Sequence, residues 1–406
     1  MSFLNKCGLM ATLALVAVAA ACSGDSGVTD AVDAPPTSQA AAPASDASGP
    51  QAPIFEVDPL WPKPLPNHWL LGSTIGVDVD AQDHVWIVHR ASTLAGNETS
   101  AMGDPPTAEE CCFPAPPVLE FDPAGNLVNS WGGPGEGYTW PSSNHGITVD
   151  HMDNVWVGGN GGTDSHALKF TRSGDFLLEV GVPGRGRDSL SLDSFSRIAK
   201  IAFDGPANEM YFADGYGNRR VAVVDADTGE LKRFWGAYGN EPDDAYDERY
   251  VPGGPNLQQF LSPVHCAEVS GSGLIYVCDR AHDRIQVFEK DGTFVDEMLV
   301  MPNTTGSGAA WDLDFSRDPD QTYIYLADGV NQRVHIIDRV TLTHLTSFGD
   351  GGRQPGQFFG THSIATDSAG NIYTTETYEG KRLQKFVYKG LGPVTTQNQG
   401  VVWPQP

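Results

Sequence analysis

The feature that most constrains the fold of this chain is an internal repeat of paired apolar segments. From Ile75 onward, an alternating segment that usually ends in Asp or Ser is followed by a turn and a second alternating segment. Alternation of apolar and polar residues is typical of half-buried β-strands, so the repeat predicts an all-β protein. Six such pairs align: 75–80 with 84–90, 145–150 with 154–157, 199–204 with 209–214, 265–270 with 274–279, 311–316 with 323–328, and 362–367 with 371–374.

Each copy continues into further strands, for example 284–288 as a third strand and 175–179 as a fourth. Four short antiparallel strands per unit, repeated every roughly 45 to 70 residues, are typical of the blades of a β-propeller. We therefore predict a six-bladed propeller over 54–406. Either 54–57 or 401–403 would complete the last blade and close the ring, which leaves few exposed strand edges. An array of β-sandwiches is the alternative fold.

The N-terminal region differs from this body. Lys6 and the apolar run 8–20 predict a signal peptide over 1–21. Small residues directly before Cys22 resemble a bacterial lipobox, which predicts a lipidated Cys22; ordinary cleavage without a lipid is the alternative. The stretch 22–53 is rich in Ala, Ser and Pro, so we expect a flexible tether. The protein is then exported, as an outer-membrane or cell-surface lipoprotein or into the periplasm.

The charge balance excludes one class of partner. The chain carries 51 acidic and 25 basic residues, for a formal net charge of −26. Such a surface repels phosphate backbones and anionic lipids, which excludes a nucleic-acid partner. Contact with a membrane is therefore expected only through a lipid anchor at Cys22.

Histidines recur at one position of the repeat. If the first strand of each blade is the innermost, its first residue faces the central channel. Histidines in alternate blades of a six-bladed ring are 120° apart and converge near the axis. Three imidazoles with an open fourth position are typical of a catalytic zinc site; hydrogen-bonding caps on the strands are the alternative. The six residues in this column are Ile75, His145, Ala199, His265, Trp311 and His362.

Positive side chains occupy a second column. Arg90 and Arg280 end the second strands of blades one and four, which face each other across the ring, and Tyr216 follows the second strand of blade three. Arginine recognises carboxylates, and a phenol beside cations can act as a base. We therefore expect a small-molecule or peptide substrate that carries a carboxylate. The alternatives are a structural salt bridge for each arginine and rim packing on a neighbouring blade for Tyr216. A salt bridge is our expectation for Arg219, Arg284 and Arg333, which recur as part of the repeat.

These segments resemble a known family. The repeats resemble those of NHL-repeat propellers. Over roughly 54–390, four segments also resemble motifs of peptidyl-α-hydroxyglycine α-amidating lyases: His145-Gly146-Ile147, Pro263 and His265 with Asp279-Arg280, the run 214–220, and Arg90. The resemblance implies zinc on the three histidines, Tyr216 as base, and Arg90 and Arg280 as substrate ligands. It also implies cleavage of the C–N bond of an α-hydroxyglycine to an amide and glyoxylate.

The same resemblance implies a structural calcium ion, held by the backbone carbonyls of Val77 and Ile147 and by an aspartate. This chain has Ser363 in place of that aspartate. Calcium then loses its only charged ligand, and a hard cation favours anionic oxygen, which counts against calcium.

Four cysteines remain in the body of the protein. Cys266 and Cys278 fall on neighbouring strands of one blade, which favours a cross-strand disulfide. Cys111 and Cys112 could form a vicinal disulfide, bind a metal, act as a redox pair or bridge to a partner. Two other functions are compatible with the pattern. One is a non-catalytic NHL platform that binds a protein or glycan, and the other is a metal-dependent hydrolase of the propeller lactonase type.

Overall fold

The computed structural model describes residues 49–404, which lie in the compact unit Ser48–Pro406. The predicted signal peptide over 1–21, Cys22 and most of the predicted tether lie outside the described residues. Within the described range, no helix has the length and apolar character needed to cross a membrane.

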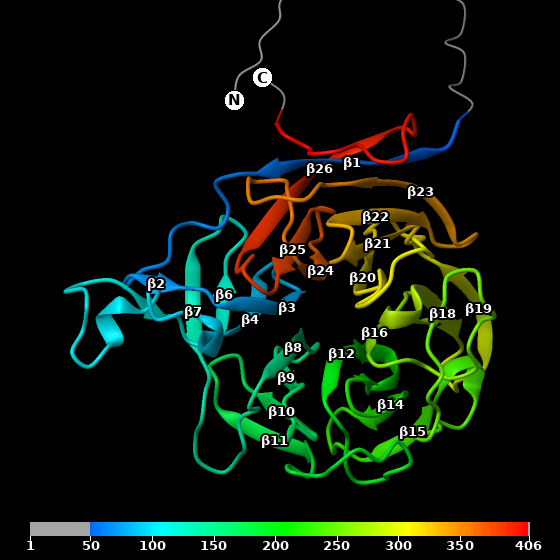
Figure 1. Ribbon diagram of the computed structural model, residues 1–406, viewed down its shortest axis with the longest axis horizontal. Coiled ribbons are helices and arrows are strands. Elements are labelled where there is room, and N and C mark those ends of the chain that lie inside the picture. Colours follow the sequence, from blue (N-terminus) through cyan, green and yellow to red (C-terminus); the bar gives the residue numbers. More distant parts are fainter. Residues whose placement is uncertain (1–48, 405–406) are drawn as a thin grey trace, which may run out of the picture. The chain divides into compact units, whose positions relative to one another are not determined.

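Six four-stranded antiparallel sheets surround a central channel, which confirms the all-β, six-bladed propeller (Figure 1). Blade one contains β3 (Ser73–Val79), β4 (Val85–Arg90), β6 (Val118–Phe121) and β7 (Leu127–Trp131); blade two contains β8 (Asn144–Val149), β9 (Val155–Gly159), β10 (His166–Phe170) and β11 (Phe176–Gly181); blade three contains β12 (Ile198–Asp204), β13 (Glu209–Asp214), β14 (Arg220–Asp225) and β15 (Leu231–Trp235).

The remaining blades follow the same order. Blade four contains β16 (Val264–Val269), β17 (Ile275–Asp279), β18 (Arg284–Phe288) and β19 (Phe294–Leu299); blade five contains β20 (Asp312–Phe315), β21 (Tyr323–Asp328), β22 (Arg333–Asp338) and β23 (Thr343–Phe348); blade six contains β24 (Thr361–Thr366), β25 (Ile372–Glu376), β26 (Leu383–Pro393) and β1 (Gln51–Asp58). The helices of the described chain are short 3-10 turns: η1 (Ala91–Thr93), η2 (Ser100–Met102), η3 (Gly205–Ala207), η4 (Ala237–Gly239) and η5 (Arg280–His282).

Closure of the ring uses the N-terminal strand. β1 pairs antiparallel with β26, with Val57 opposite Phe386, and so supplies the outermost strand of blade six (Figure 1). The first of the two candidate closing segments is therefore confirmed, although the strand begins at Gln51 rather than at Ile54. The second candidate forms no strand, but Val402 accepts a hydrogen bond from the Val57 amide at 2.8 Å and so covers part of β1.

A β-bulge at the start of the inner strand orients the residues of the histidine column. The strands β3, β8, β12, β16, β20 and β24 are the innermost of their sheets and contact one another around the channel. Strand pairing shifts register at the column position, or directly after it, in blades one to four and in blade six. A bulge inserts an extra residue and re-aims its side chain. The three histidines of the column therefore point toward one another in the channel, whereas Ile75 and Ala199 pack between blades.

The aspartates that recur in the repeat are structural acceptors. In blade one, Asp80 accepts the indole N–H of the buried Trp86 at 2.9 Å. At the ends of second strands, Asp279 pairs with Arg284 at 2.9 Å, as expected, but Asp214 pairs with Arg220 at 2.8 Å. The alternation of side chains along a strand explains this pairing. Arg220 lies opposite Asp214, and the adjacent Arg219 therefore cannot face the same carboxylate. Within the described residues neither Arg219 nor Arg333 forms a salt bridge, so that expectation was wrong for both.

Both predicted cysteine pairs form disulfides. Cys266 and Cys278 are opposite one another on β16 and β17, and their bridge ties the inner strand of blade four to its neighbour. Cys111 and Cys112 are joined to each other. They lie in the excursion 91–117 of blade one, where β5 (Phe113–Pro114) pairs with β2 (Trp69–Leu70).

Candidate metal centre

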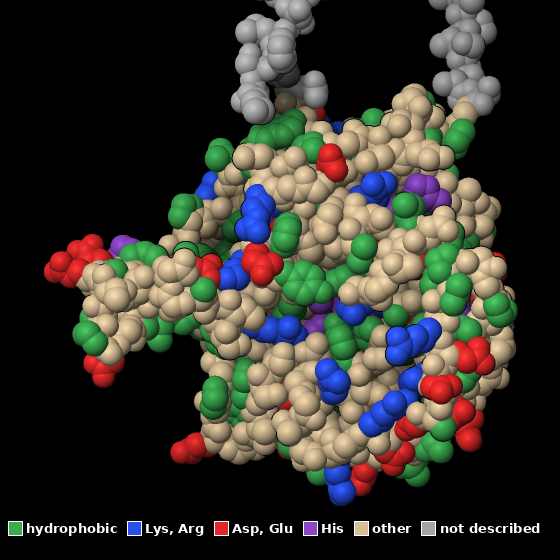
Figure 2. Space-filling view, in the orientation of Figure 1, with side chains coloured by type: hydrophobic (Ala, Val, Ile, Leu, Met, Phe, Trp, Pro, Cys, Tyr) green, Lys and Arg blue, Asp and Glu red, His purple; other side chains and the backbone are tan. Residues whose placement is uncertain are grey.

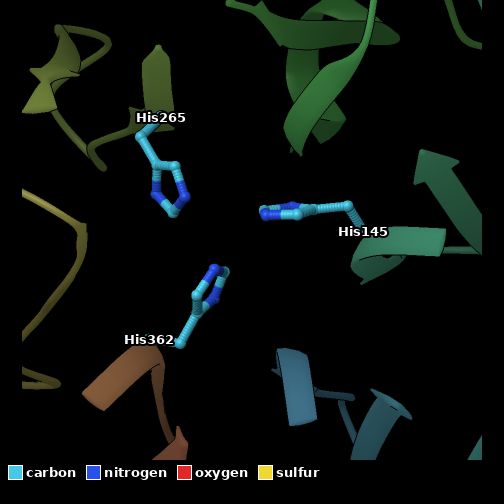
Figure 3. A group of neighbouring side chains, drawn as sticks. All are labelled: His145, His265 and His362. Carbon is cyan, nitrogen blue, oxygen red and sulfur yellow. The ribbon is translucent and has the colours of Figure 1, made fainter. Parts of the chain in front are cut away.

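The three column histidines meet in the channel. Their side chains reach inward from β8, β16 and β24 and face one another (Figure 3). The ring centroids of His145 and His265 are 5.3 Å apart, those of His145 and His362 are 4.8 Å apart, and those of His265 and His362 are 4.9 Å apart. One nitrogen of each ring lies within 4.8 Å of the other two, and all three side chains are buried. The group contains no carboxylate, unlike the calcium sites expected of a lactonase-type hydrolase.

Neighbouring blades determine which nitrogen each ring presents. The Nδ1 atoms of His145 and His265 lie 2.5 Å from the backbone oxygens of Ala199 and Trp311. Since a carbonyl only accepts hydrogen bonds, each Nδ1 carries a proton and each Nε2 keeps its lone pair. Gly146 makes this contact possible, because its φ is +74° and a Cβ there would lie 2.8 Å from the Ala199 oxygen.

His362 is oriented by a side chain instead. Its Nδ1 lies 3.0 Å from the hydroxyl of Ser363, which itself donates to the Ile75 backbone oxygen at 3.3 Å. A hydroxyl that donates to a carbonyl is free to accept from Nδ1–H. His362 therefore has the same tautomer as the other two histidines, and Ser363 has a role that the sequence did not reveal.

The electrostatic environment keeps the three imidazoles neutral. Burial lowers the pKa of each histidine well below its usual value. The charge of Arg280 lowers all three pKa values further, and that of Arg90 lowers those of His145 and His362. Neutral imidazoles are the form that binds a metal. Three converging Nε2 lone pairs, with second nitrogens anchored by carbonyls and a hydroxyl, fit a tetrahedral transition-metal ion with an open position.

Tyr216 lies directly over this cluster, in the turn between β13 and β14. Its hydroxyl is 3.2 Å from Nε2 of His145 and 3.1 Å from Nε2 of His265. Arg280 donates to the same hydroxyl at 3.0 Å. The flanking Gly215 packs against the backbone of Val264, where no Cβ fits, so the turn holds the phenol close to blade four.

The two predicted arginines are held on either side of the cluster. Arg280 donates from Nε to the Ser307 backbone oxygen at 3.0 Å, and its guanidinium lies 4.5 Å over the Trp311 ring. Arg90 donates from Nε to the Asn144 oxygen at 3.1 Å and from Nη2 to Asn160 Oδ1 at 2.6 Å. The structure therefore brings together the six side chains predicted as metal ligands and catalytic residues.

Sequence reasoning missed two residues of this site, Arg197 and Asn160. Arg197 donates from Nε to the Asn160 backbone oxygen at 2.8 Å, and its guanidinium lies 5.9 Å over the Tyr216 ring. It comes directly before β12 and has no counterpart in either aligned column, so the repeat gave no signal for it. Figure 2 shows basic side chains gathered beside a histidine near the centre of this face.

The residues deeper in the channel do not fit calcium. Val77 and Ile147 lie on the neighbouring inner strands β3 and β8, as predicted. Ser363, however, is a neutral ligand already bonded to His362 and Ile75. The nearby cavity of about 220 Å³ is lined by Val77, Asp78, Lys200, Glu268 and Asp314, among other residues. Glu268 pairs with the ammonium of Lys200 at 2.7 Å, a resident positive charge that disfavours a dication.

A second group with metal-ligand chemistry, on the outer part of blade one, is already filled by a cation. Asp80, His84 and Glu120 lie close together, but the guanidinium of Arg172 pairs with Asp80 at 2.8 Å and with Glu120. This cluster is a buried ion-pair network rather than a metal site.

No protein-family model matches the chain. NHL repeat-containing protein 3 of Mus musculus is 25% identical over 304 residues, which are 72% of this chain and 69% of the mouse protein. Peptidyl-alpha-hydroxyglycine alpha-amidating lyase 1 of Drosophila melanogaster is 26% identical over 364 residues, which are 82% of this chain and 59% of the fly protein. The chain thus spans less than two thirds of the fly lyase.

Solved structures are similar in fold only. A Bacteroides thetaiotaomicron protein of unknown function aligns with a TM-score of 0.50 at 14% identity, over 84% of this chain and 77% of that chain. A streptogramin B lyase aligns with a TM-score of 0.47 at 11% identity, over 84% of this chain and 97% of that chain.

The six blades confirm the predicted propeller class, and the likeness to NHL repeat-containing protein 3 supports the predicted resemblance to NHL-repeat propellers. Within that class, this chain carries a buried histidine cluster compatible with a metal ion and a distant likeness to an amidating lyase.

Proposed function

We propose that the protein is a zinc-dependent lyase that cleaves the C–N bond of an α-hydroxyglycine-like substrate to an amide and glyoxylate. The observation that carries this proposal is the position of the Tyr216 hydroxyl, 3.1 to 3.2 Å from two of the three convergent Nε2 atoms. A base at that distance can reach a group bound at the open position of the metal. The likeness to the fly amidating lyase supports the same reaction.

The chain's own residues account for the proton transfers. His145, His265 and His362 would hold the zinc ion, which when bound supplies a Lewis acid that favours loss of the substrate hydroxyl proton. Tyr216 accepts that proton as the C=O bond of glyoxylate forms and the C–N bond breaks. Tyr216 then returns the proton to the amide nitrogen. Arg280 donates to the phenolic oxygen and stabilises the phenolate that accepts the first proton and is restored when the proton leaves for the amide nitrogen.

The surroundings of Arg90 leave room for the rest of the substrate. A groove of about 620 Å³ runs outward from Arg90 between the excursion of blade one and the loop after β25. Its lining includes Ser73, Thr93 and the half-exposed ring of Tyr378. A substrate whose carboxylate lies at the arginines can place its acyl chain in this groove.

Glyoxylate release from α-hydroxyhippurate by the zinc-loaded protein tests the proposal. We expect Tyr216→Phe to lower kcat by about 10²- to 10⁴-fold, because it removes the proton acceptor and keeps the ring. Zinc content should not change, since the phenol is not one of the three nitrogen ligands. A Tyr216→Phe variant with unchanged turnover would contradict the assigned role, and a zinc-loaded wild type without turnover would contradict the reaction.

A second candidate is a non-catalytic propeller that binds a protein or glycan. The likeness to NHL repeat-containing protein 3, which covers most of the chain, favours it. Metal content separates the two functions, because a binding platform has no need of zinc.

For either function we propose export with a lipid anchor at Cys22, a residue outside the described range. The two disulfides support this proposal, because such bonds persist in oxidising compartments.

A further inference from the structure

The three arginines around the histidine cluster differ in how many of their hydrogen bonds are already used. Arg280 donates to Ser307 and Tyr216 and lies over the Trp311 ring. Arg90 uses Nε and Nη2. Arg197 uses Nε alone, so within residues 49–404 both of its terminal nitrogens lack an acceptor. A half-buried guanidinium with two unpaired N–H₂ groups is a ready binding site for an anion.

Asn160 joins Arg197 to Arg90. Its backbone oxygen accepts from Arg197 Nε at 2.8 Å, and its side-chain oxygen accepts from Arg90 Nη2 at 2.6 Å. Ser143 fixes Asn160 in turn, because its hydroxyl donates to Oδ1 at 2.9 Å and its backbone oxygen accepts from the Asn160 amide at 2.8 Å. One rigid residue therefore sets the position of both guanidinium groups.

Asp164 acts on Arg90 electrostatically but, within the described residues, forms no salt bridge with it. Asp164 is buried, and its oxygens accept from the Ser142 amide and hydroxyl and from the amides of Ser143 and Gly161, at 2.7 to 3.0 Å. These bonds hold the loop that carries Asn160. No salt bridge between Asp164 and either Arg90 or Arg197 occurs in the described structure. The positive charge of the two arginines therefore remains available to a ligand.

The backbone of Arg197 is held in a conformation that L-residues rarely adopt. Its φ is +66°, a left-handed value that suits glycine. Its amide donates to the Asp164 oxygen at 2.8 Å, and its own oxygen accepts from the Tyr216 amide at 3.2 Å. An arginine at such a position costs about 1 kcal/mol or more relative to an unstrained residue, and such strain is found at functional sites.

We propose that Arg197 and Arg90 together bind the substrate carboxylate, and that Arg280 is reserved for positioning Tyr216. This inference rests on the proposed function, since it assigns the carboxylate of the same substrate. It makes Arg197 a specificity-determining residue that selects α-hydroxyglycine compounds with a free carboxylate over their esters and amides.

Binding of hippurate to the zinc-loaded protein tests this without turnover. Hippurate keeps the carboxylate and lacks the hydroxyl, and isothermal titration calorimetry gives its Kd. We expect Arg197→Gly to weaken hippurate about 10- to 100-fold, because a charge-assisted contact is lost. Glycine suits the local φ, so this variant folds, and Arg197→Lys should recover part of the affinity as a point charge. In turnover, KM should rise and kcat should change little.

Two controls separate the carboxylate contact from a general effect on the site. Benzamide lacks the carboxylate, and its affinity should be the same in wild type and Arg197→Gly. The matched variant Arg219→Ala removes an arginine bonded to the Phe260 oxygen and should leave hippurate binding unchanged.

The inference is overturned if wild type does not bind hippurate, if Arg197→Gly binds it normally, or if benzamide is weakened equally. Arg197-dependent hippurate binding without glyoxylate release would refute the lyase and keep the anion site. Glyoxylate release with the same KM and kcat in Arg197→Gly and wild type would refute the anion site and keep the lyase.

Discussion

The two ends of the central channel are built from the same inner strands and have opposite electrostatics. At the histidine end, defined by His145, His265, His362 and Tyr216, neutral imidazoles lie among arginines. At the lysine end, defined by Lys200, Glu268, Asp312, Asp78 and Asp314, carboxylates surround one ammonium. Lys200 Nζ lies 2.7 Å from both Glu268 Oε1 and Asp312 Oδ1.

Adjacent residues contribute to the two ends. The backbone oxygen of Ala199 holds His145, and the next residue, Lys200, reaches the carboxylates. The oxygen of Trp311 holds His265, and the next residue is Asp312. The two ends differ in whether their charges are satisfied. At the lysine end the cation is fully paired, whereas at the histidine end the terminal nitrogens of Arg197 have no acceptor within residues 49–404. We infer that the histidine end binds ligands and that the lysine end stabilises the fold.

The largest effect should come from removing two ligands at the histidine end. The double variant His145→Ala, His265→Ala leaves one imidazole, too few to hold zinc, so we expect the metal content to fall from about one ion per chain to none and turnover to be lost. The fold should persist, because the apolar packing between blades does not include these side chains. Elemental analysis after dialysis and circular dichroism measure the two quantities.

The exposed His151, which stacks on Phe203 at 4.9 Å, offers a matched control. His151→Ala should keep its zinc. A double variant that still bound one zinc per chain would place the metal elsewhere and contradict the role of the histidine end as the metal site.

At the lysine end, Lys200→Met should affect stability and leave the metal in place. Burial alone would lower the pKa of Lys200, but the charges of Asp312 and Glu268 outweigh it and raise that pKa. The substitution leaves two buried carboxylates without a cation. Removing one partner of a buried ion pair typically costs about 3 to 5 kcal/mol, which chemical denaturation measures.

A compensating variant tests the cause. Lys200→Met combined with Glu268→Gln and Asp312→Asn removes the uncompensated charges, so it should be more stable than Lys200→Met alone. Loss of zinc from Lys200→Met would show that the two ends are not independent. An unchanged free energy of unfolding would show that the ion pair is not the structural element.

The division between the two ends explains what could be predicted from the sequence. The histidine column, Tyr216, Arg90 and Arg280 could be predicted because they occupy corresponding positions in the repeats. In a propeller, corresponding positions of the blades are arranged around one axis. The closing strand was one of two apolar candidates, and no local signal distinguishes 54–57 from 401–403.

The residues whose roles sequence reasoning missed act through contacts between blades. Arg197 lies in a connector, and its role follows only from Asn160 of the preceding blade. Lys200 and Ser363 each have partners in other blades, Asp312 and Ile75 respectively. The bulges that aim the histidines also leave no sequence pattern beyond Gly146. Contacts of this kind depend on the closed ring, which a single repeat does not encode.

Acid should affect the two ends in opposite directions. Burial lowers the pKa of the three histidines, so the unfolded chain binds protons more readily than the fold. The stability that they contribute is therefore present above their ordinary pKa of about 6.5 and is lost as the pH falls below it. Burial raises the pKa of Glu268 from 4.5 to about 7. Its contribution is present below pH 4.5 and is lost as the pH rises toward 7.

The variant Glu268→Gln isolates the second effect. In zinc-free protein, stability between pH 4.5 and 7 should fall less steeply with rising pH in the variant, by on the order of 2 kcal/mol over the range. Urea denaturation across the pH series gives the slope, and other buried carboxyls cancel in the comparison with wild type. An identical slope in both proteins would mean that Glu268 stays ionised in the fold and that the lysine end does not respond to pH.

The smallest expected effect is that of calcium. Lys200 already pairs with Glu268 and Asp312 at this end of the channel, and Ser363 offers a neutral hydroxyl engaged by His362 and Ile75, so millimolar calcium should not shift Tm. The double variant His145→Ala, His265→Ala is the right background, because it has no zinc for added metal or chelator to affect. A rise in Tm with calcium, reversed by chelation, would contradict the structural role of Lys200.

Adding Lys200→Met and Ser363→Asp to that background removes the ammonium and supplies an anionic ligand. If Lys200 replaces the ion, only this last protein should be stabilised by calcium.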